Sequence, residues 1–356
     1  KDGIHGATFS SEELHGASPA QAVQIGDPIT QKKLSDFTLE ARDLGLYRFL
    51  TDNGAGGLSS SIGEMATNCG GCRLDLAKAP LKYAGLVPWE ILLSEAQERM
   101  SYAVIPEKLP DFLALAARRE VEVAVLGEFT DNGKFHILYH GKTVAFLDLE
   151  LMHDGCPRLR LPARWTVPQH SEPDLPQDAD LGALTLGLLS RFNLCSGEAK
   201  ARQYDHEVKG LSISKPFVGV RGDVPSDASV FQVEPLGHDG IVLSAAVLPR
   251  YSDIDTWHMT AAVIELAVRR AVAVGADPER LAGLDNFCWP DPVLSAKTPD
   301  GPYKLAQFVR ANQALFEYTQ AFQVPCISGK DSMKNDSTRG GRKISIPPTL
   351  LFSVID

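Results

Sequence analysis

The strongest local sign of chemistry is a glycine-rich loop that begins with a carboxylate, Asp52-Asn53-Gly54-Ala55-Gly56-Gly57. An apolar stretch over 44–50 predicts a strand before it, and helix-compatible residues 62–66 follow. Glycines let backbone amides approach an anion closely, and the start of a helix adds its positive end. Asp52 could hold a magnesium ion beside that anion. The alternative is a tight strand-to-helix turn, because the loop matches neither the P-loop nor the dinucleotide fingerprint.

A second loop follows another apolar strand and reads Ser328-Gly329-Lys330-Asp331-Ser332. It combines a glycine, a lysine, a carboxylate and a hydroxyl, which are the groups that a phosphate and its metal require. The alternative is a polar surface turn. Asp285, at the end of a further predicted strand, and Asp227 add carboxylates to the same half of the chain, although either could be a cap or turn residue.

The cysteines and histidines favour structural roles. Six cysteines in 356 residues are too few for a disulfide framework, so we expect reduced thiols. Cys69 and Cys72 have the spacing of a zinc knuckle or redox pair, but no second pair follows at zinc-finger spacing. His136 and His140 lie in a strand-like stretch, where an even spacing only places both on one face.

Two domains are predicted to position these loops. Residues 1–168 alternate strands (44–50, 121–126, 143–149) with a helix at 109–119, which is an α/β signature. Residues 169–190 are a linker, at first rich in Pro, Gln, Ser and Asp, and 191–356 form an α+β domain. The expected elements from the linker onwards are helices at 181–192, 256–274 and 303–322 and strands at 230–233, 240–248, 281–285, 324–328 and 349–355.

Composition excludes several classes of protein. The formal net charge of -10 argues against a general nucleic-acid binder, while leaving room for local phosphate sites. No apolar run reaches the ~18 residues of a spanning helix, and the N-terminus lacks the layout of a signal peptide. We therefore expect a cytoplasmic protein with no membrane or nucleic-acid partner.

Seven motifs in order carry a family resemblance: DGIHGATFSS, VQIGDP, TDNGAGGLSSS, LSEAQERM, RQYDHEV, LDNFCWPDP and SGKDSM. Together they closely resemble phosphoribosylformylglycinamidine synthase, a purine-biosynthesis ligase related to aminoimidazole ribonucleotide synthetase, selenophosphate synthetase and thiamine monophosphate kinase. The resemblance implies an α/β domain like the C-terminal domain of aminoimidazole ribonucleotide synthetase, followed by a ferredoxin-like α+β ATP-binding domain. It also implies an internal part of a longer enzyme, because the chain opens inside a family motif.

The resemblance assigns roles position by position. It implies substrate contacts at Gln24, Glu95, Ala96, Gln97 and Ser332, nucleotide contacts at Asp285 and Gly329, and magnesium ligands at Asp52, Asp331 and Asp227. Lys330 stands where relatives often have a metal-binding Asn, so either Lys330 or Asp331 faces the metal. Asp227 belongs to an auxiliary nucleotide site, but Leu266 and Arg270 occupy its expected Glu and Asn positions, which argues against an intact site. The family's catalytic histidine lies outside this chain.

The implied reaction converts formylglycinamide ribonucleotide, ATP and glutamine-derived ammonia to formylglycinamidine ribonucleotide through an iminophosphate. The implied partners are the remaining synthetase domains and a glutaminase domain or subunit, with a possible homodimer through residues past 190. The chain alone is expected to bind ligands without turning over. Two alternatives stay open: another ATP-dependent member of the superfamily, and a non-catalytic structural remnant, which Arg270 favours.

Overall fold

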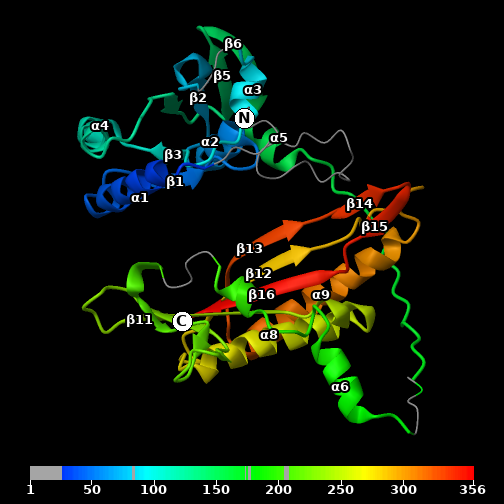
Figure 1. Ribbon diagram of the computed structural model, residues 1–356. Helices are drawn as coiled ribbons and strands as arrows, with labels where there is room; N and C mark the ends of the chain where they lie inside the picture. Colours follow the sequence, from blue (N-terminus) through cyan, green and yellow to red (C-terminus); the bar gives the residue numbers. More distant parts are fainter. Residues whose placement is uncertain (1–25, 82–84, 173, 175–177, 204–207) are drawn as a thin grey trace. The chain divides into compact units, whose positions relative to one another are not determined.

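The computed structural model describes residues 26–81, 85–172, 174, 178–203 and 208–356 (Figure 1). The chain divides into two compact units, whose described parts are residues 26–159 and the described residues from 160 onwards. Each unit mixes helices with strands, as the sequence predicts. The division falls earlier than 168, where the sequence places the end of the first domain. Within the described residues no helix has both the length and the apolar character needed to span a membrane.

The first unit contains a mixed four-stranded sheet in the order β4-β2-β5-β6. Strand β2 (Cys72–Asp75) runs parallel to β5 (Lys134–Tyr139), while β4 (Gly127–Phe129) and β6 (Lys142–Asp148) are antiparallel to their neighbours. Alternate residues of β2 and β5 are buried and form a core with the apolar side of α2 (Gly57–Thr67). This core fixes the start of α2, where the glycine-rich loop ends.

A second core lies between α1 (Pro28–Asp43), α4 (Leu109–Arg118) and a small antiparallel sheet. In that sheet β1 (Phe49–Asp52) pairs with β3 (Met100–Ala103), and Asp52 lies opposite Met100. The loop after β1 and the segment before β3 therefore meet at one end of the sheet. The remaining helices of this unit are α3 (Pro88–Leu93), α5 (Leu149–Asp154), and the 3-10 turns η1 (Leu76–Lys78) and η2 (Pro106–Lys108).

The second unit is built on a six-stranded sheet in the order β13-β12-β16-β11-β10-β7. Only the β12–β13 pair is parallel. Buried side chains of the sheet pack against α8 (Thr256–Ala273) and α9 (Gly301–Ala321), which lie together against the sheet (Figure 1). The strands are β7 (Ser212–Ser214), β10 (Ser229–Gln232), β11 (Gly240–Val247), β12 (Ala282–Cys288), β13 (Cys326–Ser332) and β16 (Thr349–Ile355).

Shorter elements complete the second unit. They are α6 (Leu181–Leu189), α7 (Glu198–Ala201), the hairpins β8 (Phe217–Val218) with β9 (Val224–Pro225) and β14 (Asp336–Arg339) with β15 (Arg342–Ser345), and the 3-10 turns η3 (Val208–Gly210) and η4 (Pro249–Asp253).

An extended strap ahead of α6 packs on the helices of the second unit. The backbone N–H of Arg164 donates to the carbonyl of Pro302 at 2.9 Å. The Trp165 ring stacks on Tyr303 at 5.4 Å between centroids, and the guanidinium of Arg310 lies 4.5 Å from the Trp165 ring centre. Arg310 also pairs with Asp255, the residue that caps α8. Aromatic and cation–π contacts of this kind hold the strap on α9.

Two sequence expectations in the first unit are wrong in part or whole. The strand expected at 44–50 begins only at Phe49, because α1 runs to Asp43 and Gly45 turns the chain with φ +62°. Residues 121–126 join no sheet. Val121 and Val123 instead pack against the second core, which accounts for their apolar character without strand pairing. The structure also adds α1, which begins at Pro28, a residue preorganised for a first helical position.

Candidate functional site

Buried Asn53 joins the glycine-rich loop to the segment Ser94–Arg99. Its backbone N–H and its side-chain amide both donate to the carbonyl of Arg99, each at 3.2 Å, and its own carbonyl accepts from Ala96 at 3.3 Å. Its side-chain oxygen accepts from the hydroxyls of Ser61 and Ser101 at 2.8 and 3.2 Å. Asn53 is 1% exposed, so these bonds satisfy it away from water and fix the two loops against each other.

Gly57 brings the start of α2 against the same segment. It has φ +53°, and a Cβ at this position would lie 2.3 Å from the carbonyl oxygen of Ser94. A side chain is therefore excluded both by the backbone conformation and by the close approach.

The predicted substrate and metal positions of the first unit lie around this junction. Asp52 ends β1, and its Oδ1 accepts from the N–H of Gly54 at 2.7 Å. Glu95, Ala96 and Gln97 lie in the segment that Asn53 holds. Glu98 accepts from the N–H of Asp27 at 3.1 Å, which adds the end of the VQIGDP motif. Gln24, the other predicted substrate contact, lies outside the described residues.

In the second unit Asp285 and Gly329 are direct neighbours on the parallel pair β12–β13. A Cβ on Gly329 would lie 2.8 Å from Oδ1 of Asp285, so the glycine leaves room for that carboxylate. Burial, and then the charge of Asp331, raise the pKa of Asp285, although the Cys326 thiol and a backbone N–H partly offset this. Two carboxylates that repel each other in this way suit a bound cation.

Strand alternation separates the residues of the SGKDSM motif. Gly329 and Asp331 share one face of β13, whereas Lys330 and Ser332 project from the other. The ammonium of Lys330 donates to the hydroxyl of Ser332, and the charge of Asp331 raises the pKa of Asp285. Both interactions agree with this alternation. Asp331 therefore lies on the side of the nucleotide positions, and Lys330 with the predicted substrate contact Ser332.

We expect Asp285→Asn to stabilise the second unit slightly at pH 7. A raised carboxyl pKa means that the folded state loses stability as the pH rises from the unfolded value of about 3.9 through the folded one. The amide removes this penalty and can still accept from Cys326. Because the group is largely solvent-screened, the gain should be only about a few tenths of a kcal/mol, vanishing below about pH 4.

Urea unfolding of Asp285→Asn between pH 4 and 8 measures this effect. Asp239→Asn, at an exposed position before β11, is the matched control and should show no such pH dependence. A loss of stability at pH 7 would contradict the expectation.

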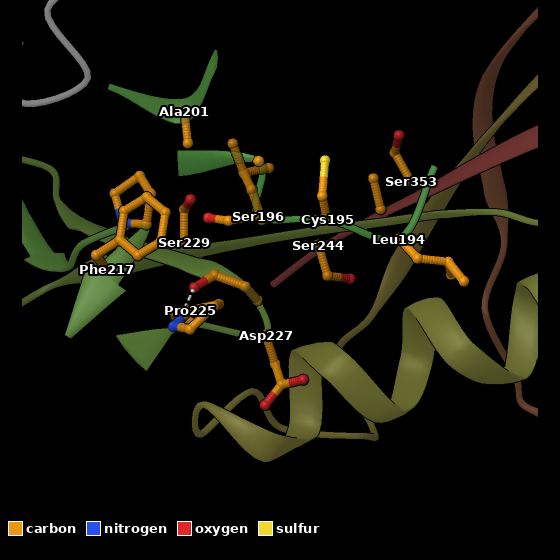
Figure 2. A pocket seen from close by; sticks show the side chains of 16 residues that line it. Leu194, Cys195, Ser196, Ala201, Phe217, Pro225, Asp227, Ser229, Ser244 and Ser353 are labelled. Carbon is orange, nitrogen blue, oxygen red and sulfur yellow. Dashed lines mark hydrogen bonds between the residues drawn. The ribbon is translucent and has the colours of Figure 1, made fainter. Parts of the chain in front are cut away.

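Asp227 lies apart from Asp331 within the second unit. It precedes β10, which is four strand spacings from β13, or about 19 Å. It borders a cavity of about 830 Å³ on the sheet. Figure 2 shows its carboxylate away from the hydroxyls of Ser196 and Ser229, which line another part of the same cavity.

The neighbouring helix offers Asp227 no second carboxylate. Glu265 is engaged by Arg269 on α8, and Leu266 packs against the core. Arg270 donates to the carbonyl of Ala245, a cavity-lining residue, at 2.6 Å. A guanidinium here disfavours a metal ion. In the part of the chain that the structure describes, no three His, Cys, Asp or Glu side chains gather into a potential metal site.

The cysteine and histidine pairs have structural surroundings. Burial raises the pKa of Cys72 to about 11, which disfavours the thiolate that metal binding or redox exchange needs, while Cys69 is exposed. His136 shares a hydrogen bond with Thr143 at 2.8 Å, and His140 lies at a turn with φ +50°.

The sequence does not indicate the roles of two residues of the first site. The sequence motifs TDNGAGGLSSS and LSEAQERM contain Asn53 and Arg99 but assign no role to either residue. Arg99 donates through Nη2 to the carbonyl of Ser94, while its Nε is buried without an acceptor. The only signal in the sequence was their place beside the glycine-rich and SEAQ segments.

Comparisons with known proteins find one matching family model and similar curated proteins. Residues 1–140 match the family described as AIR synthase related protein, C-terminal domain. The phosphoribosylformylglycinamidine synthase subunit PurL of Deinococcus radiodurans is 34% identical over 364 residues, covering 100% of this chain and 46% of that subunit.

Two solved structures are similar in fold. T. maritima PurL complexed with FGAR has a TM-score of 0.69 at 26% identity, covering 99% of this chain and 52% of that one. T. maritima PurL complexed with ADP has a TM-score of 0.69 at 25% identity, covering 93% and 50%. The chain spans about half the length of the curated relatives it matches. Over its whole length the chain is thus similar to about half of phosphoribosylformylglycinamidine synthase subunit PurL, and its residues 1–140 match the AIR synthase related C-terminal domain.

Proposed function

We propose that this chain contributes to the cytoplasmic, ATP-dependent ligase that converts formylglycinamide ribonucleotide to formylglycinamidine ribonucleotide in purine biosynthesis. Similarity over the whole chain to PurL subunits carries the proposal. The junction of Asp52 with the segment Glu95–Gln97 supports it, because residues assigned to metal and substrate lie on loops that Asn53 joins.

The proposed reaction activates an amide. Transfer of the γ-phosphoryl group of ATP to the amide oxygen gives an iminophosphate and ADP, and attack by ammonia then expels phosphate. Glu95, Ala96 and Gln97 would hold the ribotide at the first unit. Asp285 and Gly329 would contact the nucleotide, and Ser332 the substrate. Fixed positions for both reactants supply much of the catalysis in such transfers.

Magnesium fits the carboxylates present. One carboxylate oxygen of Asp52 accepts from the N–H of Gly54, and the other does not take part in that bond. Asp331 lies near Asp285, and the charge of Asp331 raises the pKa of Asp285. We propose Asp52 and Asp331 as ligands, where the ion would neutralise phosphate charge. Asp227 would be a ligand only at the auxiliary site. Because the positive charge of Arg270 opposes a cation there, we propose that this site holds no magnesium.

The partners in this proposal are the other synthetase domains and a glutaminase that supplies ammonia. The exposed face of the six-stranded sheet, with Leu243 and Leu284, suits pairing with a similar sheet in a homodimer or within a longer chain.

Ligand-induced thermal stabilisation tests the proposal. Formylglycinamide ribonucleotide and magnesium-ATP should each raise the melting temperature, because binding to the folded state at a hundred times Kd contributes about 2.7 kcal/mol. Asp52→Asn should reduce the magnesium-dependent part of the shift, whereas Asp43→Asn, on the exposed end of α1, should not. The same samples, supplied with ammonia, should form no product in repeated turnovers. The absence of any shift with either ligand would refute the proposal.

A further inference from the structure

Arg99 is a cation at the junction of the two loops, and it has no counter-charge among the residues that the structure describes. The residue is half-buried, and its Nε is out of contact with water and has no hydrogen-bond acceptor. No carboxylate of the described residues forms an ion pair with its guanidinium, whose one hydrogen bond goes to the carbonyl of Ser94. A desolvated charge normally has a partner in proteins, since the free energy of leaving it unpaired is several kcal/mol.

The surroundings of Arg99 are built to stay in place. Its backbone carbonyl accepts two bonds from buried Asn53, and Gly57 packs against the Ser94 carbonyl that the guanidinium contacts. These contacts fix the backbone of Arg99 and the Ser94 carbonyl that its guanidinium reaches. Burial lowers the pKa of the Arg99 guanidinium.

A phosphate group is the anion that this environment suits best. The planar guanidinium presents several N–H donors to phosphate oxygens, and a phosphate would supply the missing negative charge. The start of α2, which packs on the same Ser94 carbonyl, adds a favourable dipole.

We propose that Arg99 is an anion-binding residue that receives a phosphate group of the ligand held by the Glu95–Gln97 segment. The proposal rests on the proposed function for the presence of a phosphorylated ligand there. The phosphate could belong to the ribotide or to ATP, and the experiment separates these two sources.

Calorimetry on the full chain tests the proposal with three ligands: formylglycinamide ribonucleotide, its dephosphorylated riboside, and magnesium-ATP. Arg99→Gln should weaken binding of the phosphorylated ligand at least about tenfold, the scale of a lost charged hydrogen bond, and leave the riboside unchanged. Arg99→Lys should keep most of the affinity, because it keeps the charge. Arg119→Gln, a surface cation paired with Glu40, is the control and should have no effect. A loss confined to ATP assigns the phosphate to the nucleotide, and a loss confined to the ribotide assigns it to the substrate.

Two results would overturn the assignment. Unchanged affinity in Arg99→Gln would mean that water satisfies the guanidinium, and an equal loss for ribotide and riboside would mean that Arg99 only holds the Ser94 carbonyl. If the wild-type chain binds neither the ribotide nor ATP, the proposed function is contradicted, and a second measurement then tests the role of Arg99 by itself. In that case pyrophosphate, compared with chloride at equal ionic strength, should still raise the melting temperature of the wild type more than that of Arg99→Gln, and equal shifts would refute the role of Arg99.

Discussion

Gly57→Ala is expected to destabilise the first unit by about 2–4 kcal/mol. An L side chain at φ +53° costs about 1–2 kcal/mol, and the new Cβ would lie 2.3 Å from the backbone oxygen of Ser94. Backbone atoms cannot rotate aside as a side chain does, so the segment Ser94–Arg99 must move away from α2. Urea unfolding should report the loss of stability, and hydrogen exchange should report faster exchange at Ala96, whose N–H bonds to Asn53.

Gly133→Ala separates the two causes. Gly133 belongs to the same unit and has φ +72°, but nothing lies within 4 Å of a Cβ there. Its substitution should cost only the conformational part, about 1–2 kcal/mol, and leave exchange at Ala96 unchanged. Equal losses for the two variants would show that the close approach to Ser94 contributes nothing.

Gly329→Ala should weaken magnesium-ATP binding by about tenfold or more while changing stability by less than about 1 kcal/mol. The added Cβ would lie 2.8 Å from a carboxylate oxygen of half-buried Asp285, and a side-chain carboxylate can move aside at lower cost than backbone atoms can. The displacement changes the geometry of the proposed nucleotide position, where an error of an ångström is costly. Calorimetry measures the affinity, and urea unfolding the stability.

Gly240→Ala is the matched control for this variant. It lies at the start of β11 in the same sheet, and the nearest atom to a Cβ there is 3.5 Å away, an ordinary contact. It should leave nucleotide affinity unchanged. If Gly329→Ala binds ATP as the wild type does, Asp285 is not a nucleotide contact.

Most elements of the second unit could be predicted because local signals agree with tertiary packing. Helix α8 is expected at 256–274 and spans Thr256–Ala273, since Asp255 caps its start and Gly275 follows its end with φ +108°. Strand β16 has the expected bounds. Helix α1 is not predictable from the sequence, because only Phe37 and Ala41 are buried along it and the apolar pattern is therefore weak.

The site was predictable only as a set of separate loops. The sequence places Asp52 and Glu95 on two segments, but their meeting depends on the pairing of β1 with β3, which no local pattern specifies. Asn53 and Arg99 gain their roles only from that pairing. The sequence could not predict that Asp331 and Lys330 lie on opposite faces, because the expected strand ends at 328. In the structure β13 continues through Ser332, so the side chains of Asp331 and Lys330 alternate.

The strap around Trp165 changes where the second unit should be cut for separate expression. A piece that starts at 191, after the polar linker, would leave the ring of Tyr303 and the guanidinium of Arg310 without the indole that covers them. A piece that starts at 160 retains the indole and the backbone bond from Arg164 to Pro302. The strap residues therefore belong to the second folding unit, although composition alone would assign them to a segment outside it.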